Sequence, residues 1–281
     1  MITVKCAGLS NARLVRNHLK DFKPDSYRFY SEFNGPIMLY ILRKGCFLVM
    51  EDKRLLAIIF TNPASHHVYY IPTASKPLSF MAASFFIKKC TPSKGYTLKL
   101  TYSSVSFKAA SSYLNVKPVT NLKHMSCLIS SLSLQSTVLP QGVIIQPMKK
   151  GEESIRAELQ NSIFGGIKNR IPLTAEEIKD EEQLSEYIGS MCYILRLDGK
   201  PSGYGQIMIS NGTYTLINFG IIPQCRRQGL ADVLLRYILY QCQSCGIESL
   251  HLTVDNNNPP AIALYKKNGF TELYNTAELI I

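Results

Sequence analysis

Residues 217–235 read INFGIIPQCRRQGLADVLL, which is an apolar run followed by a short polar loop and a helical pattern. A loop that passes from a strand into a helix presents unpaired backbone N–H groups, which attract anions together with the helix dipole. Gly229 lets the backbone approach a ligand closely, and Arg226 and Arg227 add positive charge. The stretch therefore predicts a diphosphate site, although it is neither a GK[ST] loop nor a GxGxxG loop.

Strand and helix patterns alternate along the second half of the chain. Strands are predicted at residues 143–147, 191–197, 202–209, 213–222 and 249–254, and helices at 152–163, 174–188, 229–244 and 259–268. Thr174 and Glu177 have the spacing of a capping box at the start of the second helix. This alternation predicts a mixed α/β fold.

The first half repeats the order of these patterns. Residues 45–72 and residues 189–223 both read as strand, charged turn, strand, turn and a strand that ends in Pro. Residues 98–129 and 250–281 both read as strand, polar turn, short helix with Ala and Tyr, and further strand. We expect an internal duplication with a period of about 140 residues. The Ser-rich stretch before Gly142 then predicts two domains, residues 1–138 and 139–281.

The charge of the chain is uneven. Residues 1–140 carry 18 Lys and Arg against 5 Asp and Glu, whereas residues 141–281 carry 13 against 15. The lysines are scattered and form no dense block, which favours a role in solubility. Attraction of a phosphate-rich partner such as a nucleic acid is the alternative.

Composition excludes several classes of protein. With 46% hydrophobic and 18% charged residues, the 281-residue chain can bury a core. No apolar run approaches the roughly 20 residues of a membrane span, and the N-terminus does not resemble a signal peptide. The eight Cys lack metal-ligand spacing, so we expect reduced thiols, a cytoplasmic protein and no metal site.

Two motifs resemble those of the GNAT acyltransferases. Motif A of that family is V-x-P-x-x-[RQ]-x-x-G-x-[GA], and its fixed positions are filled by Ile221, Pro223, Arg226, Gly229 and Ala231. Residues 256–270, NNNPPAIALYKKNGF, resemble motif B, N-x-x-A-x-x-L-Y-x-x-x-G-F. The resemblance covers most of residues 143–281. It implies two GNAT-like domains, each a mixed, mostly antiparallel, splayed sheet flanked by helices, with a degenerate first copy that lacks the glycine loop after Pro72.

The resemblance also implies a site for acetyl-CoA. The main chain of Phe219, Gly220 and Ile221 would bind the pantetheine arm, and Asn258 would bond it from the other side. The diphosphate would be held by the loop and first helical turn, comprising Arg226, Arg227, Gln228, Gly229, Leu230, Ala231 and Asp232. Tyr265 would protonate the leaving thiolate, and a backbone N–H near Ile221 would meet the oxyanion.

Two positions depart from the family pattern. Members that resemble ribosomal-protein N-acetyltransferases carry a Glu base on the strand before motif B, where this chain has Thr253. The alternatives are a water held by Asn218 and Thr253, an amine that arrives neutral, or the weaker candidates His251 and Asp255. His124, like His66 and His67, is predicted to lie at the surface. Asp232 would repel a diphosphate unless it points away or complements the helix dipole.

The sequence as a whole predicts an N-acyltransferase, most simply an acetyltransferase. An amine acceptor, either a small molecule or a peptide, would attack acetyl-CoA directly in a ternary complex. The acidic run 176–182 is typical of a solvated helix face. The resemblance places this run over the acceptor site, so a cationic acceptor is the alternative. Two rival functions remain: a FemX-like transferase that uses aminoacyl-tRNA, and a non-catalytic CoA-binding regulatory module.

Overall fold

The computed structural model describes residues 2–21, 37–62, 66–72, 87, 97–102, 118–135, 138–166, 170–210 and 212–280. The chain divides into two compact units. One comprises residues 1–123 together with 274–281, and the other comprises residues 124–273. The domain boundary between residues 138 and 139 stays a prediction, and each unit is described by itself.

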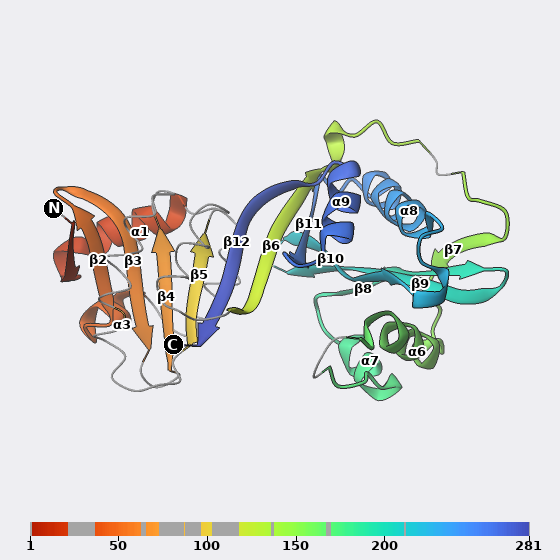
Figure 1. The fold of residues 1–281 in the computed structure, drawn as a ribbon, viewed down its shortest axis with the longest axis horizontal. Coiled ribbons are helices and arrows are strands. Elements are labelled where there is room, and N and C mark those ends of the chain that lie inside the picture. The colour runs from red at the N-terminus through yellow and green to blue at the C-terminus, as the bar shows by residue number, and fades with distance from the viewer. Residues whose placement is uncertain are drawn as a thin grey trace. The chain divides into compact units, whose positions relative to one another are not determined.

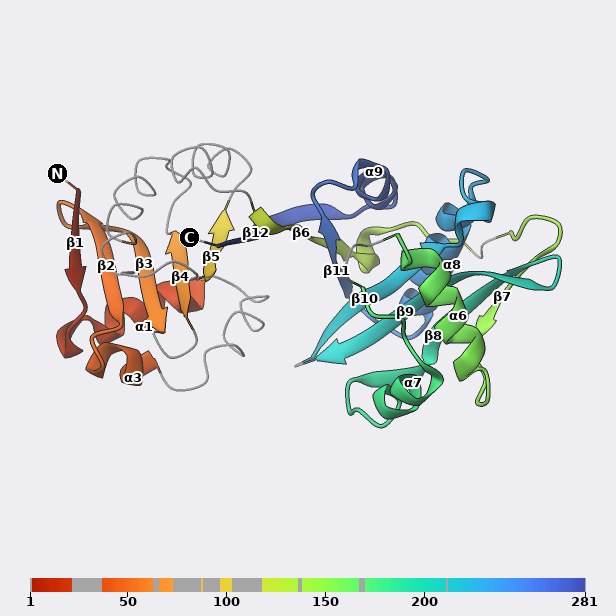
Figure 2. The same ribbon diagram turned by 60° about the horizontal axis from the view of Figure 1, so that its bottom comes forward.

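The first unit contains a sheet, and its described helices α1 and α3 pack on one face of it. Its elements are β1 (Ile2–Cys6), η1 (Leu9–Asn11), α1 (Ala12–Asp21), α3 (Ile37–Leu42), β2 (Cys46–Glu51), β3 (Arg54–Asn62), β4 (His67–Pro72) and β5 (Thr97–Tyr102). The strand order continues from β5 to β12 (Thr271–Ile280), whose residues from Tyr274 onward belong to this unit. Val15, Leu19 and Ile41 of the two helices belong to one core cluster with sheet residues. Figure 2 shows α1 and α3 beside the sheet.

The second unit has helices on both faces of its sheet. Its elements are the part of β6 (Pro118–Leu128) from His124 onward, η2 (Ile129–Ser131), β7 (Val143–Pro147), α6 (Glu153–Phe164), α7 (Ala175–Glu181), β8 (Tyr187–Leu197), β9 (Lys200–Ser210), β10 (Thr213–Ile221), η3 (Pro223–Cys225), α8 (Leu230–Ser244), β11 (Ser249–Asp255) and α9 (Pro259–Lys267). The strand order is β6-β11-β10-β9-β8-β7. Helices α8 and α9 lie on one face and α6 and α7 on the other (Figure 1).

The two units share one topology. Among the described elements of each unit, a first strand and two α-helices precede three antiparallel strands, and a further strand pairs in parallel with the last of these. The parallel pairs are β4 with β5 and β10 with β11. This is the arrangement that the predicted duplication requires. The segment after Pro72 and the helix predicted within residues 98–129 lie outside the described residues.

Most predicted elements of the second unit are confirmed to within a few residues, but one helix end is wrong. The helix predicted to run from Thr174 to residue 188 ends at Glu181. Residues 182–186 form turns, and β8 begins at Tyr187, which pairs with Met208 of β9. Sheet pairing of the β-prone Tyr187 therefore overrides the local helical pattern.

The predicted capping box at the start of α7 is confirmed. The Thr174 hydroxyl accepts from the Glu177 amide at 3.2 Å, and the Glu177 carboxylate accepts from the Thr174 amide at 2.8 Å. We expect Thr174→Ala to lower the free energy of unfolding by about 1 kcal/mol because one helix donor loses its acceptor. Urea unfolding would measure this, with Thr174→Ser as the matched control that keeps the hydroxyl. Equal losses in the two variants would contradict the capping role.

A single apolar core joins α8 and α9 to the sheet of the second unit. Helix α8 lies directly on β9 because Gly205 has no side chain. A Cβ at Gly205 would lie 2.7 Å from Ile238 Cδ1 and 3.1 Å from the Phe219 ring. This close approach brings the N-terminus of α8 to the end of β10, where the sequence predicts the site.

Candidate functional site

A β-bulge interrupts β10 in the middle of motif A. Ile217 pairs with Gln206 of β9, but the next pair is Gly220 with Tyr204, so Asn218 and Phe219 lie opposite a single residue. Asn218 has a left-handed backbone with φ +50°, which is rare for a residue other than glycine. Such bulges bend a strand and leave backbone groups without ladder partners. The bulge therefore offers main-chain groups to a ligand at the position predicted for pantetheine.

The strands β10 and β11 diverge beside this bulge. Their parallel pairing covers only Thr215 with His251 and Leu216 with Leu252. Beyond these pairs, residues 217–221 of β10 have no strand on their β11 side within the described part of the sheet. The sheet is thus splayed where the sequence predicts it, and the open edge carries Phe219, Gly220 and Ile221.

The loop before α8 is built from two left-handed residues. Arg227 has φ +63° and Gly229 has φ +77°. A Cβ at Gly229 would meet nothing within 4 Å, so its surroundings are open and its backbone conformation favours glycine. Among the described residues, no backbone carbonyl accepts from the amides of residues 227–231. These amides and the positive end of α8 form a concave donor set of the kind that binds phosphate groups.

The two arginines of the loop differ in their contacts. Arg226 donates from Nε to the carbonyl of Ile221 at 3.0 Å and from Nη2 to the carbonyl of Ile163 at 2.9 Å. Its guanidinium therefore holds the loop to β10 and α6, and it has fewer donors left for a phosphate. Arg227 is exposed next to Gln228 and Gly229, which makes its charge available to an anion.

Asp232 points away from the loop, which resolves the apparent conflict with a bound diphosphate. Its carboxylate accepts from Lys267 Nζ and from Asn268 Nδ2, both at 2.8 Å, and so connects the first turn of α8 to the end of α9. Partial burial acts to raise the Asp232 pKa, but the hydrogen bonds from Lys267 and Asn268 and the nearby charges leave the pKa below its ordinary value. Asp232 is therefore ionised and paired at neutral pH.

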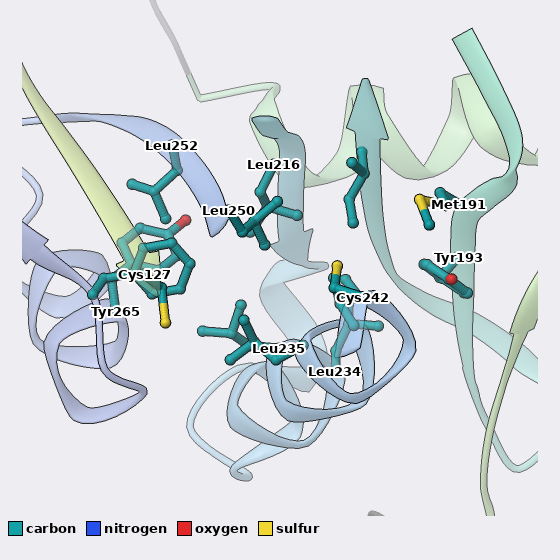
Figure 3. Packing of buried hydrophobic residues seen from close by; sticks show 14 of the residues in the cluster. Cys127, Met191, Tyr193, Leu216, Leu234, Leu235, Cys242, Leu250, Leu252 and Tyr265 are labelled. Atoms are coloured by element: carbon teal, nitrogen blue, oxygen red, sulfur yellow. The ribbon is translucent and has the colours of Figure 1, made fainter. Parts of the chain in front are cut away.

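Helix α9 places the two motif B residues. Asn258 is the N-cap, and its side-chain oxygen accepts from the Ala261 amide at 3.2 Å, which leaves its NH₂ group to donate elsewhere. Tyr265 is buried, and its ring centroid lies 6.1 Å from that of Phe219 on the splayed edge. Figure 3 shows Tyr265 among Leu250 and Leu252. Burial raises the pKa of Tyr265 to about 12, so the phenol keeps its proton.

A buried polar network lies on the opposite face of the sheet. Arg156 of α6 is fully buried and donates from Nη2 to Glu181 at 2.6 Å and to Gln206 at 2.9 Å. The Gln206 oxygen also accepts from Tyr204 and, at 3.3 Å, from Asn218 Nδ2. The guanidinium lies 5.3 Å from the centroid of the Tyr204 ring. The network therefore connects the bulge to α6 and α7, and the sequence did not predict it.

The acidic run 176–182 is largely engaged within the protein. Glu177 caps α7, Glu181 pairs with Arg156, and Glu182 accepts from the Tyr187 hydroxyl at 3.4 Å. A cationic acceptor would therefore meet fewer unpaired carboxylates than the sequence suggests.

The histidine on β6 lies in a position that the sequence did not indicate. His124 is half-buried, not a surface residue, and its Nδ1 lies 3.2 Å from Thr253 Oγ1 on β11. Of the other two histidines predicted at the surface, His66 is exposed, and His67 is half-buried and stacked on Tyr69 at 6.0 Å. Asp255 is exposed, and His251 Nε2 lies 3.5 Å from Ser249 Oγ.

The described residues contain neither a metal-binding cluster nor a membrane-spanning helix. No three side chains of His, Cys, Asp or Glu in these ranges gather closely enough to hold a metal ion. Likewise, no helix in the described part of the chain has the length and hydropathy needed to cross a membrane.

Comparison with known proteins gives consistent matches. Residues 158–270 match the model of the Acetyltransferase (GNAT) family. The chain is 33% identical over 78 residues to the [ribosomal protein bS18]-alanine N-acetyltransferase of Escherichia coli K12, which is 28% of this chain and 53% of that protein. It is 23% identical over 163 residues to the mycothiol acetyltransferase of Pseudarthrobacter chlorophenolicus, covering 55% of this chain and 50% of that protein. The chain thus spans about half the length of the curated relatives it matches.

Solved structures extend the similarity to the whole chain at the level of fold. A GCN5-related N-acetyltransferase from Sphaerobacter thermophilus aligns with 99% of this chain and 94% of its own, at a TM-score of 0.61 and 17% identity. A tandem GNAT protein from the clavulanic acid biosynthesis pathway aligns with 100% of this chain and 98% of its own, at a TM-score of 0.50 and 10% identity. Both halves therefore share the fold of the tandem structures, and the match to the Acetyltransferase (GNAT) family lies in the second half of the chain, at residues 158–270.

Proposed function

We propose that the second unit is an N-acyltransferase that moves an acetyl group from acetyl-CoA to an amine. The observation that carries this proposal is the combination of the bulge at Asn218, the divergence of β10 from β11, and the open amides before α8. These features form one continuous path along a strand edge to a helix N-terminus. Such a path fits an extended thioester arm that ends in a diphosphate.

The residues present fit this substrate. The amides of residues 227–231 and the Arg227 side chain would hold the diphosphate, and Arg226 would fix the loop through its bonds to Ile221 and Ile163. The open edge at Phe219, Gly220 and Ile221 would pair with the pantetheine arm, and the Asn258 NH₂ group would bond it. Of the other predicted members of the set, Gln228, Leu230 and Ala231 would contribute backbone amides only, whereas the Asp232 amide donates to the Gly229 carbonyl at 3.0 Å.

The reaction would be direct attack of the amine on the thioester carbonyl. Backbone amides of the bulged strand would stabilise the oxyanion, because the bulge leaves them without ladder partners. Tyr265, whose pKa is raised to about 12, would carry the proton that the leaving thiolate takes. Gln206 would hold the side chain of Asn218. The acceptor class, a small-molecule or peptide amine, belongs to this proposal.

Blocking the loop with a charged side chain tests the proposal. We expect Gly229→Glu to weaken acetyl-CoA binding at least about tenfold, because the side chain adds negative charge where the diphosphate would bind. Titration calorimetry measures this. Gly246→Glu is the matched control, since Gly246 follows the other end of α8 with φ +71° and equally open surroundings. Both variants strain a left-handed residue, but only the first alters the loop.

The calorimetric outcomes separate the rival functions. Wild-type binding that is lost only in Gly229→Glu supports an acetyl-CoA site, and turnover with an alanyl peptide or an alkyl amine then supports the transferase. Binding without turnover of either amine would favour a regulatory CoA-binding module. No binding by wild type would contradict the proposal and direct the search to aminoacyl-tRNA.

A further inference from the structure

The proposed acyl transfer leaves one proton without an assigned acceptor. The attacking amine must lose a proton, and Thr253 and Asn218, the side chains at the diverging ends of β11 and β10, are a hydroxyl and an amide. Neither accepts a proton near neutral pH. This inference rests on the proposed function, and it concerns which group of this chain takes that proton.

His124 lies beside Thr253 on the face of the sheet opposite α8. Met125 and Cys127 of β6 and Leu252 and Val254 of β11 belong to the core that packs under α8. Because strand side chains alternate between faces, His124 and Thr253 both point to the other side, and their contact of 3.2 Å shows that they share one face.

The same face carries the polar groups at the bulge. Asn218 bonds Gln206, which in turn bonds Arg156 of α6. Asn218 and Thr253 are the first polar side chains past the last β10–β11 pair on their respective strands. His124 of β6 therefore lies on the face that bears α6 and α7, one strand from the gap, and reaches it through its contact with Thr253 of β11.

We propose that His124 is the proton acceptor for the amine and that Thr253 orients its imidazole. With Nδ1–H donating to Thr253 Oγ1, the basic lone pair is on Nε2, which is the tautomer a general base needs. The proton leaves the amine for His124, directly or through one water, as the C–N bond forms. The C–S bond breaks, and the thiolate takes the Tyr265 proton. His124 then returns its proton through solvent to Tyr265.

This residue is contributed by a part of the chain outside the family match. His124 precedes residues 158–270, and 129 positions separate it from Thr253. The described titratable groups near it that share its face by alternation are His251 and Asp255 on β11 and Glu272 and Tyr274 on β12. Imidazole ionises near neutral pH, so a histidine suits this role at physiological pH.

Kinetics of His124→Gln, with acetyl-CoA and the alanyl peptide, test the proposal. We expect kcat to fall at least about tenfold, with acetyl-CoA affinity by calorimetry unchanged within about twofold. In wild type, kcat/KM should fall below a midpoint between about pH 5.5 and 7.5, and this limb should vanish in the variant. Thr253→Val should lower kcat less, Thr253→Ser should restore it, and adding Thr253→Glu to His124→Gln should recover activity by supplying a carboxylate.

Each outcome decides the question. Turnover within threefold of wild type and an unchanged pH profile in His124→Gln overturns the role of His124 while leaving the transferase proposal intact. If His124→Gln loses both acetyl-CoA binding and turnover, His124 supports the fold. This outcome also overturns its proposed role as the proton acceptor. Wild-type binding without turnover of any amine overturns both proposals.

Discussion

Replacing Tyr265 by Phe is expected to lower kcat by about 10²- to 10⁴-fold, because the leaving thiolate loses its proton donor. The acetyl-CoA dissociation constant should stay within about twofold, since the aromatic contacts with Phe219 and Phe270 do not need the hydroxyl. Steady-state kinetics and calorimetry together measure this split. The pKa of Tyr265, raised to about 12 by burial, keeps the phenol protonated, so ionisation of Tyr265 should cause no loss of activity up to about pH 10.

Tyr237→Phe is the matched control for this variant. Tyr237 lies on α8, where its ring is 5.5 Å from that of Tyr193, and burial raises its pKa as well. It lies on the core side of α8 and has no part in the proposed chemistry. Equal kcat values for Tyr265→Phe and wild type would contradict the role of Tyr265 as the acid.

The second large effect is expected at Arg156, and it concerns stability. Arg156→Met should lower the free energy of unfolding by about 3–5 kcal/mol, because Glu181 and Gln206 lose their common donor in a buried site. Since the chain has no Trp, urea unfolding followed by circular dichroism is the suitable measurement. The bulge should also loosen, because Gln206 holds Asn218.

The chain offers a control in a second Arg–Glu pair, which has the same contact distance but a less buried arginine. Arg196 contacts Glu152 at 2.6 Å, as Arg156 contacts Glu181, but the Arg196 side chain is 16% exposed whereas that of Arg156 is fully buried. Arg196→Met should cost distinctly less. Adding Glu181→Leu to Arg156→Met should recover part of the loss, because no unpaired charge remains. A loss at Arg156 no larger than at Arg196 would refute the burial argument.

The glycine loop and motif B could be predicted because their signals are local. A glycine must occupy the left-handed position before α8, and Asn258 must cap a helix whose first residues are prolines. Such requirements act within a few residues, so the sequence shows them directly. The paired strands were predictable for the same reason, since alternation and turn residues are local.

The polar network and the candidate base could not be predicted, because they form only on folding. Arg156 reads as an ordinary helix arginine, which normally extends its charged end into water. Its burial depends on Glu181 and Gln206, which are 25 and 50 positions away. His124 reads as an isolated histidine until β6 lies beside β11. The predicted end of α7 was wrong for a related reason, since pairing with β9 decides where β8 begins.

The membership of residues 274–281 in the first unit has a consequence for the order of synthesis. Residues Asn275–Ile280 of β12 pair with β5, and Ala277 and Leu279 enter the core of that unit. The β5–β12 pairing and this part of the core cannot form until the ribosome has made β12, the last strand of the described chain. Most of the first unit is therefore translated before the second unit, but the first unit is completed after it. Strand β5 stays unpaired with β12 while the second unit is made.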